Sequence, residues 1–205
     1  MEIDQFHRYV LRQLPELSAD ELAEFTAAFT LRQVRKRQYI IEPGLVAAHL
    51  TYVVQGAFQA YVIDPAGGSH TIQFAIDDWW ITDANSYLYR QPASMYVVAL
   101  EDSTVLQLDF ATEQRLKQAN HHFETLFRLH AERAVAYHQR RLISALTRTA
   151  EERYEEFLAT YPAVIQRLPQ YIIASYLGMT KGFLSRIRKH GGGRKADPAP
   201  RNLVH

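Results

Sequence analysis

The spacing of apolar residues changes character twice along the chain and divides it into three stretches. In the first stretch, a helical spacing predicts an amphipathic helix over residues 3–14, from Ile3, Phe6, Val10 and Leu14. Ser18 followed three residues later by Glu21 matches a capping box, in which each side chain bonds the backbone of the other residue. The box predicts a second helix from this point to about residue 28.

The middle stretch has the composition of a β-structure. Residues 29–110 are rich in Val, Ile, Thr, Tyr and Phe, in short runs that turn residues interrupt at Pro43-Gly44, Gly56, Asp64 to Gly68, Asp77-Asp78 and Gln91-Pro92. Many short strands at this spacing are typical of a β-sandwich or barrel. We expect strands at residues 49–55, 57–63, 70–76 and 95–108.

From about Thr112 the apolar period becomes helical. One stripe comprises Leu116, Ala119, Phe123, Leu126, Phe127, His130, Ala134, Tyr137, His138, Leu142 and Leu146. No Pro or Gly lies between Pro92 and Pro162, so neither of these helix breakers interrupts the stripe. A helix packed only on its own barrel would explain the stripe. We favour a dimer interface over residues 112–147, because the stripe outruns the surface that a small barrel can cover.

Residues 148–190 have the pattern of a compact helical unit that ends in a helix-turn-helix. The segment from residue 170 reads QYIIASYLGMTKGFLSRIRK, and its core positions are Ile173, Ala174, Leu177, Met179, Leu184 and Ile187. Gly178 supplies the positive φ that a tight turn requires, and Thr180 can cap the second helix. The outer side keeps Lys181, Ser185, Arg186, Arg188 and Lys189, a basic face short enough to enter a DNA major groove. An ordinary helical hairpin is the alternative interpretation.

The charge of the chain changes sign near residue 110, where the apolar pattern also changes. The net charge of +1 conceals a net of −7 over residues 1–110 and +8 over residues 111–205. Residues 164–205 alone hold eight basic residues and one acid, Asp197. This split indicates an acidic module joined to one that meets a polyanion. A basic tail that only aids solubility is the alternative.

The sequence contains no motif typical of an enzyme or of a metal site. The chain has no cysteine, and its nine histidines form no His-x-His pair. The adjacent His121 and His122 would point about 100° apart on a helix and share a metal ion poorly. Serine-nucleophile motifs and glycine-rich phosphate loops are absent, so we predict no catalytic residue, no metal site and no cofactor. We also expect a cytoplasmic protein, because no run of 18 apolar residues and no secretory leader is present.

The order of these parts resembles the Crp/Fnr family of bacterial transcription regulators over residues 5–190. Pro43-Gly44 and the segment Tyr52-Val53-Val54-Gln55-Gly56 are similar to the turn and strand landmarks of its barrel, and residues 99–105 are similar to the strand that closes it. Thr180 to Arg186 resembles the start of its recognition helix.

The resemblance implies an α+β fold. Its parts are a cyclic-nucleotide-binding-like sensor barrel of double-stranded β-helix (jelly-roll) type at residues 1–111, a dimerisation helix at 112–147, a winged-helix-like DNA-binding unit at 148–190 and a flexible tail at 191–205. It further implies a homodimer that binds double-stranded DNA at a pseudo-palindromic operator, with RNA polymerase as a further candidate partner. We expect Thr180, Lys181, Ser185, Arg186, Arg188 and Lys189 to contact the DNA.

The sensor region departs from the family at its phosphate-binding segment. Members that bind cyclic nucleotides have a Gly-Glu pair and, ten residues after the Glu, an Arg-Ser/Thr pair. Here these positions hold Thr82-Asp83 and Ala93-Ser94, so the arginine that would neutralise the phosphate is missing. We therefore predict no control by cyclic AMP. Loss of the charge-assisted contact would cost roughly 1.5–3 kcal/mol or more.

An unknown small-molecule effector is the remaining prediction for this region. Candidate pocket residues are Trp80, Asp83, Ser94, His138 and Gln139. The aromatic residues around Trp80 indicate either a pocket suited to an apolar effector or a barrel that binds nothing. Likewise, two functions remain open: a DNA-binding regulator, or a sensor or interaction protein that has lost DNA binding. Gly182 inside the recognition helix favours the second, and the basic face favours the first.

Overall fold

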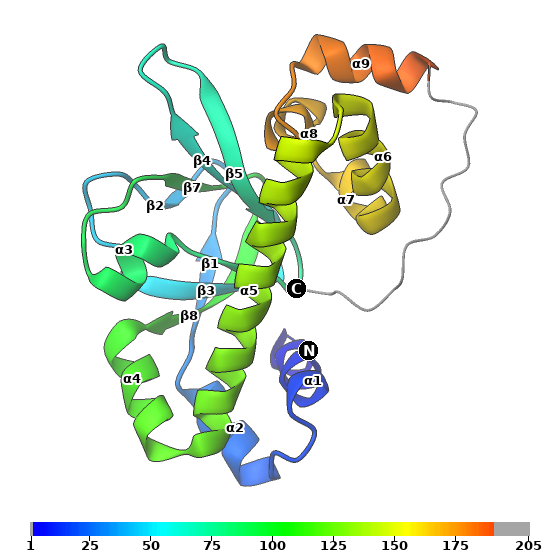
Figure 1. Cartoon of the computed structure of the whole chain (residues 1–205). Coiled ribbons are helices and arrows are strands. Elements are labelled where there is room, and N and C mark those ends of the chain that lie inside the picture. The colour runs from blue at the N-terminus through cyan, green and yellow to red at the C-terminus, as the bar shows by residue number, and fades with distance from the viewer. Residues whose placement is uncertain (1, 191–205) are drawn as a thin grey trace.

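The computed structural model of the chain describes residues 2–190. Its helices are α1 (Glu2–Gln13), α2 (Ala19–Ala27), α3 (Ala84–Tyr89), α4 (Phe110–Ala119), α5 (His121–Thr147), α6 (Ala150–Thr160), α7 (Pro162–Arg167), α8 (Gln170–Tyr176) and α9 (Lys181–His190). In Figure 1, α5 runs along one side of the strands, with α1 and α2 near its beginning and α6 to α9 gathered around its end. The predicted tail at 191–205 lies outside the described residues.

The strands form a sandwich of two antiparallel four-stranded sheets. They are β1 (Thr30–Val34), β2 (Tyr39–Ile41), β3 (His49–Gln55), β4 (Phe58–Ile63), β5 (Ser69–Ala75), β6 (Trp80–Ile81), β7 (Tyr96–Ala99) and β8 (Ser103–Asp109). One sheet has the order β1-β8-β3-β6 and the other β2-β7-β4-β5. The central strands β3 and β8 are almost wholly buried, and their buried polar side chains are paired, as in the hydrogen bond from Gln107 to Thr51 at 3.2 Å.

Several predicted elements are confirmed. The first two helices lie where the apolar spacing placed them, and the Ser18–Glu21 capping box forms with both of its hydrogen bonds. Strands β3, β4 and β5 match the predicted segments to within one residue. The α+β class and the sandwich followed by a long helix and further C-terminal helices are therefore as expected.

Two predicted elements are wrong because each is interrupted. The strand expected at 95–108 is two strands, since β7 pairs in one sheet and β8 in the other and the chain crosses between them at residues 100–102. The single helix expected at 112–147 is α4 and α5, with Asn120 between them in an extended conformation. The side chain of Asn120 caps α5 by accepting from the amide of His122, a role for which Asn is well suited.

The core joins the sandwich to the helices through a cluster of aromatic side chains. Phe6 on α1 packs against Phe29, Tyr52 and Trp80 with ring centroids 4.7–6.2 Å apart. Farther along, Phe25 on α2 meets Phe123 and Phe127 on α5. Such buried aromatic pairs each contribute about 0.5–1.5 kcal/mol beyond the area they bury. This packing fixes the first half of α5 against the sandwich and the two N-terminal helices.

The C-terminal helices also dock on the sandwich. The hydroxyl of Ser175 on α8 accepts from the amide of Thr71 at 2.8 Å and donates to the carbonyl of Ser69 at 3.1 Å, so it engages the backbone of β5. The guanidinium of Arg167, at the end of α7, pairs with Asp77 at 2.7 Å and with Glu101 at 2.5 Å. The position of α8, and through the following turn that of α9, is thereby tied to the sandwich.

Candidate functional site

The turn between α8 and α9 has the geometry that the sequence predicts. Gly178 has a φ of +68°, a backbone conformation that favours glycine. The amide of Met179 donates to the carbonyl of Ala174 at 2.9 Å and closes the turn. Thr180 then caps α9, because its hydroxyl oxygen accepts from the amide of Phe183 at 3.1 Å. Leu184 is buried, so α9 is held to the rest of the C-terminal unit by its inner side.

The outer side of α9 is basic and solvent-exposed. The side chains of Lys181, Arg186, Arg188 and Lys189 are exposed, Thr180 is exposed before the helix, and Ser185 is half-buried. At about 100° per residue, Lys181, Ser185 and Arg188 fall within about 60° of one another, whereas Arg186 lies about 140° from Lys181. The guanidinium of Arg186 lies 5.3 Å from the ring centroid of Phe183. The helix thus carries a basic face with Arg186 on its flank.

Asp83 and Ser94, the two partial matches to a phosphate-binding segment, lie next to each other, but their polar groups bond to each other. Asp83 is buried and caps α3, accepting from the amide of Ser86 at 3.1 Å and from the amide of Ser94 at 2.9 Å. The Ser94 hydroxyl lies 3.3 Å from the same carboxylate. These donors point at Asp83 and not at a cavity. Asp83 therefore acts here as an internal anion that holds the loop before β7 to α3.

Neither neighbouring side chain replaces the missing arginine. Ala93 is buried, and its backbone bonds Gly44 and Leu45 across the turn at Pro43-Gly44. Arg90 donates to the carbonyls of Ala47 and Tyr87 and lies 5.1 Å from the ring centroid of Phe110. Its guanidinium is thus engaged in structural contacts. No cationic side chain contacts Asp83 in the part of the chain that the structure describes.

The other candidate effector residues lie apart from Asp83. Trp80 is buried in the aromatic core and donates through Nε1 to the hydroxyl of Tyr9 at 2.8 Å. His138 and Gln139 are exposed on α5. Partial burial lowers the pKa of His138, and the charge of Arg141 lowers it further, so the ring is neutral at pH 7. The five candidates therefore do not converge on one pocket, although Trp80 and His138 line the same small cavity.

Two small cavities lie where α5 meets the sandwich. One, of about 20 Å³, is bordered by α1, α2, β6 and α5, and the other, of about 40 Å³, by β5, the segment around Trp80 and α5. Both contain Trp80, His130 and Arg133 in their walls. Pockets for drug-sized ligands measure roughly 300–1,000 Å³. In this conformation neither cavity admits a nucleotide.

The second half of α5 leaves an apolar face uncovered. Val135, Leu142, Ile143 and Leu146 are 53–76% exposed, although they continue the helix whose first half is buried. Val135 and Leu142 are one heptad apart and Leu146 lies four residues farther on, a spacing that places them along one side of the helix. The apolar stripe predicted from the sequence therefore has two parts on α5. Its residues on this helix up to Tyr137 are buried or half-buried, and its residues from His138 onward are exposed.

Sequence reasoning missed the polar contacts that connect the two parts of the chain. Arg141 on α5 donates to the carbonyls of Thr71, Ile72 and Tyr176, and its guanidinium lies 4.2 Å from the centroid of the Tyr176 ring. The hydroxyls of Tyr137 and Tyr176 are hydrogen-bonded, and burial raises the pKa of both phenols. Nothing in the spacing of single residues signals such long-range contacts.

The described residues form neither a metal-binding cluster nor a membrane-spanning helix. No group of three or more His, Asp or Glu side chains among residues 2–190 is arranged to hold a metal ion. Within the same range, no helix is long and apolar enough to cross a bilayer.

Comparisons with known proteins agree with the fold. Residues 31–120 match the family model of the cyclic nucleotide-binding domain. No curated protein sequence matches the chain significantly.

Several solved structures share the architecture at low sequence identity. FixK2 from Bradyrhizobium japonicum is 19% identical with a TM-score of 0.68, over 84% of this chain and 90% of that one. The c-di-GMP responsive global regulator CLP from Xanthomonas campestris is 13% identical with a TM-score of 0.66, over 84% and 91%. The Catabolite Activator Protein of Thermus thermophilus is 19% identical with a TM-score of 0.53, over 93% and 91%. Residues 31–120 thus match the cyclic nucleotide-binding domain, and the structural neighbours of the chain are regulators of the Crp/Fnr family, as the sequence predicts.

Proposed function

We propose that the chain is a DNA-binding transcription regulator of the Crp/Fnr type that acts as a homodimer and is not controlled by cyclic AMP. The observation that carries the proposal is the basic outer face of α9, held on its inner side by buried Leu184 and preceded by the turn at Gly178. A short helix presented in this way fits the DNA major groove. Its exposed lysines and arginines supply the phosphate contacts that provide most of the affinity for DNA.

Dimerisation through α5 follows from its uncovered apolar face. Val135, Leu142 and Leu146 are exposed on the second half of the helix, whereas Tyr137 and Arg141 of the same half contact other parts of the chain. Burial of such side chains against a second copy contributes about 1.5–3 kcal/mol for each residue that becomes fully buried. We expect a dimeric mass by light scattering at micromolar concentration. A monomeric mass would contradict the proposal.

Independence from cyclic AMP follows from the occupied segment at α3. A cyclic phosphate would have to displace the carboxylate of Asp83 from its donors at Ser86 and Ser94, without any guanidinium to replace the lost charge. We expect no heat of binding for cyclic AMP or cyclic GMP in calorimetry. A micromolar dissociation constant for either nucleotide would refute this part of the proposal.

The test of DNA binding is selection from a random pool. The full chain is incubated with random duplex DNA, and the bound fraction is amplified and sequenced. We expect a pseudo-palindrome whose half-sites are about one helical turn, roughly 34 Å, apart. Failure of a folded dimer to retain any DNA would favour the alternative function, a sensor or interaction protein. The feature that favours this alternative is Gly182, which leaves a gap in the middle of the basic face.

A further inference from the structure

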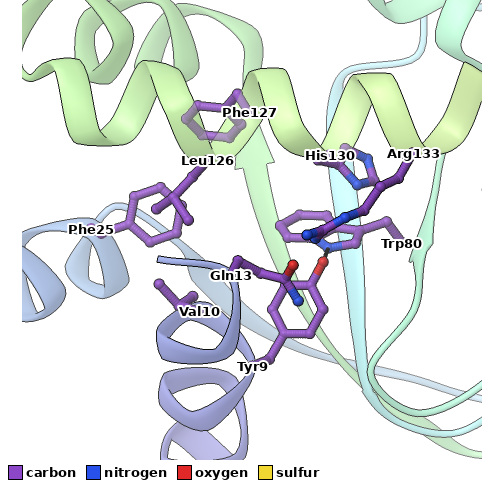
Figure 2. A pocket seen from close by; sticks show the side chains of 9 residues that line it. All are labelled: Tyr9, Val10, Gln13, Phe25, Trp80, Leu126, Phe127, His130 and Arg133. Carbon is purple, nitrogen blue, oxygen red and sulfur yellow. Dashed lines mark hydrogen bonds between the residues drawn. The ribbon is translucent and has the colours of Figure 1, made fainter. Parts of the chain in front are cut away.

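The smaller of the two cavities combines apolar walls with unused polar groups. It lies where α1, β6 and the first half of α5 meet, and Figure 2 shows Tyr9, Gln13, His130 and Arg133 around it. The rest of its lining is aromatic and aliphatic, and no acidic side chain takes part. The second cavity adjoins it, because Trp80, His130 and Arg133 belong to both.

The polar groups of this cavity retain hydrogen-bonding capacity. The hydroxyl of Tyr9 accepts from Trp80 Nε1, but no group in residues 2–190 accepts the hydroxyl proton. The guanidinium of Arg133 makes neither an ion pair nor a hydrogen bond with any residue that the structure describes. Arg141, two turns farther along the same helix, instead donates to three carbonyls. Arg133 is half-buried, and its nitrogens are not among the fully buried atoms left without a partner, so they can still donate to a ligand that enters the cavity.

The local charges favour an anion. The positive charge of Arg133 acts on both Tyr9 and His130. Burial lowers the pKa of His130 to about 4, and the charge of Arg133 is the second cause of this shift. The ring is therefore neutral at pH 7. Asp78 also acts on Tyr9, but its carboxylate is already engaged by Gln5, Arg12 and Tyr52.

We propose that this cavity binds a small monoanion with a flat oxyanion group, either a short carboxylate or an inorganic oxyanion such as nitrate. The planar guanidinium of Arg133 can donate to two oxygens at once, and Tyr9 can donate its free hydroxyl proton. The aromatic walls take any apolar part of the ligand. The cavities of about 20 and 40 Å³ restrict the ligand to a few non-hydrogen atoms.

Such a ligand would contact α1, α5 and the segment around Trp80 at the same time. It would join α1 to the helix that carries the exposed apolar face, with Trp80 of the sandwich between them. The inference does not rest on DNA binding, because the site can be filled whether or not α9 contacts an operator.

The test follows the indole N–H signal of Trp80 by NMR in the full chain. The protein has two tryptophans, so Trp79→Phe identifies the signal of Trp80. Acetate and nitrate are titrated separately at constant ionic strength, with bulky gluconate as the balancing anion. We expect a saturable shift with at least one of the two anions; acetate alone indicates an organic ligand and nitrate alone an inorganic one. A shift that stays linear with concentration for both anions would overturn the proposal.

Variants of the same helix distinguish the site from nonspecific effects of the anion. We expect Arg133→Gln to raise the dissociation constant at least about tenfold. Arg133→Lys keeps the charge without the planar fork, so it should also weaken binding and remains informative if Arg133→Gln does not fold. Arg128→Gln is the matched control, because Arg128 is paired with Glu132 at 2.8 Å outside the cavity. Equal affinity in the Arg133→Lys and control proteins would contradict the assignment.

Discussion

The beginning of α3 and the outer side of α9 both carry groups suited to an anion, but they use these groups in opposite ways. At α3, the amides of Ser86 and Ser94 are bonded to the buried carboxylate of Asp83. At α9, the side chains of Lys181 and Lys189 reach solvent. A phosphate would displace a protein group at the first region and only water at the second. The difference shows that a residue pattern resembling a ligand site has a structural role where the donors are satisfied by a carboxylate of the protein itself.

The largest effect should come from removing the internal anion. We expect Asp83→Ala to lower the free energy of unfolding by about 3 kcal/mol, because it removes a helix cap and leaves the buried amides without an acceptor. Urea denaturation followed by circular dichroism measures the loss. Asp20→Ala is the control, since Asp20 is exposed in the first turn of α2, and it should cost less than about 0.5 kcal/mol. Equal stability of Asp83→Ala and wild type would remove the contrast between the two regions.

The next effect concerns the turn that presents α9. We expect Gly178→Val to destabilise the C-terminal unit by about 2 kcal/mol, because a β-branched residue resists a φ of +68°. A Cβ added at Gly178 would meet little, since the closest atom is Nη2 of Arg153 at 4.0 Å, so the penalty is one of backbone conformation. Hydrogen exchange of the α8 and α9 amides locates the change. Unaltered protection in both helices would show that the turn tolerates the substitution.

The third effect concerns sequence reading on DNA. We expect Arg186→Ala to cost about 1–3 kcal/mol of binding and to relax preference at one base pair, because its planar guanidinium can engage O6 and N7 of guanine. Lys181 should also face base edges. Thr180, Ser185, Arg188 and Lys189 should mainly contact phosphates. Binding of Arg186→Ala to selected and to random duplexes checks this assignment. Unchanged affinity together with unchanged preference would show that another side of α9 reads the DNA.

The smallest effect concerns the gap in the basic face. We expect Gly182→Ala to raise the free energy of unfolding by about 0.5–1 kcal/mol, because a Cβ meets no atom within 4 Å and alanine favours a helix. Thermal unfolding measures the gain. If DNA affinity also stays within twofold, the gap has no role in reading the operator. A marked loss of affinity would instead show that the backbone at Gly182 approaches the DNA closely.

The sequence predicted the elements whose signals are local. The capping box at Ser18, the positive φ at Gly178 and the strands at 49–55, 57–63 and 70–76 each depend on residues a few positions apart, and the structure has them to within one residue. The crossing between sheets at residues 100–102 and the break at Asn120 were missed, because they depend on which distant partner each half packs against.

The candidate effector site could be predicted only in part. The resemblance to cyclic-nucleotide-binding members singles out Asp83 and Ser94, and the structure brings them together. Their role could not be deduced, because it depends on whether the donors face a cavity or a carboxylate. The sequence alone does not show that Arg133 lacks a partner among the described residues. Its neighbours on the helix, Arg128 and Arg141, are also arginines, and both are paired in the structure.

The salt dependence of DNA binding measures whether the basic face of α9 contacts DNA phosphates. The affinity of the full chain for a selected duplex is measured over a range of salt concentrations, for wild type and for Lys189→Ala. We expect binding that weakens linearly on logarithmic axes, with the slope reduced by about one per protomer in Lys189→Ala and equal losses on selected and random DNA. A folded, dimeric wild-type protein that binds no DNA even at low salt would contradict this expectation.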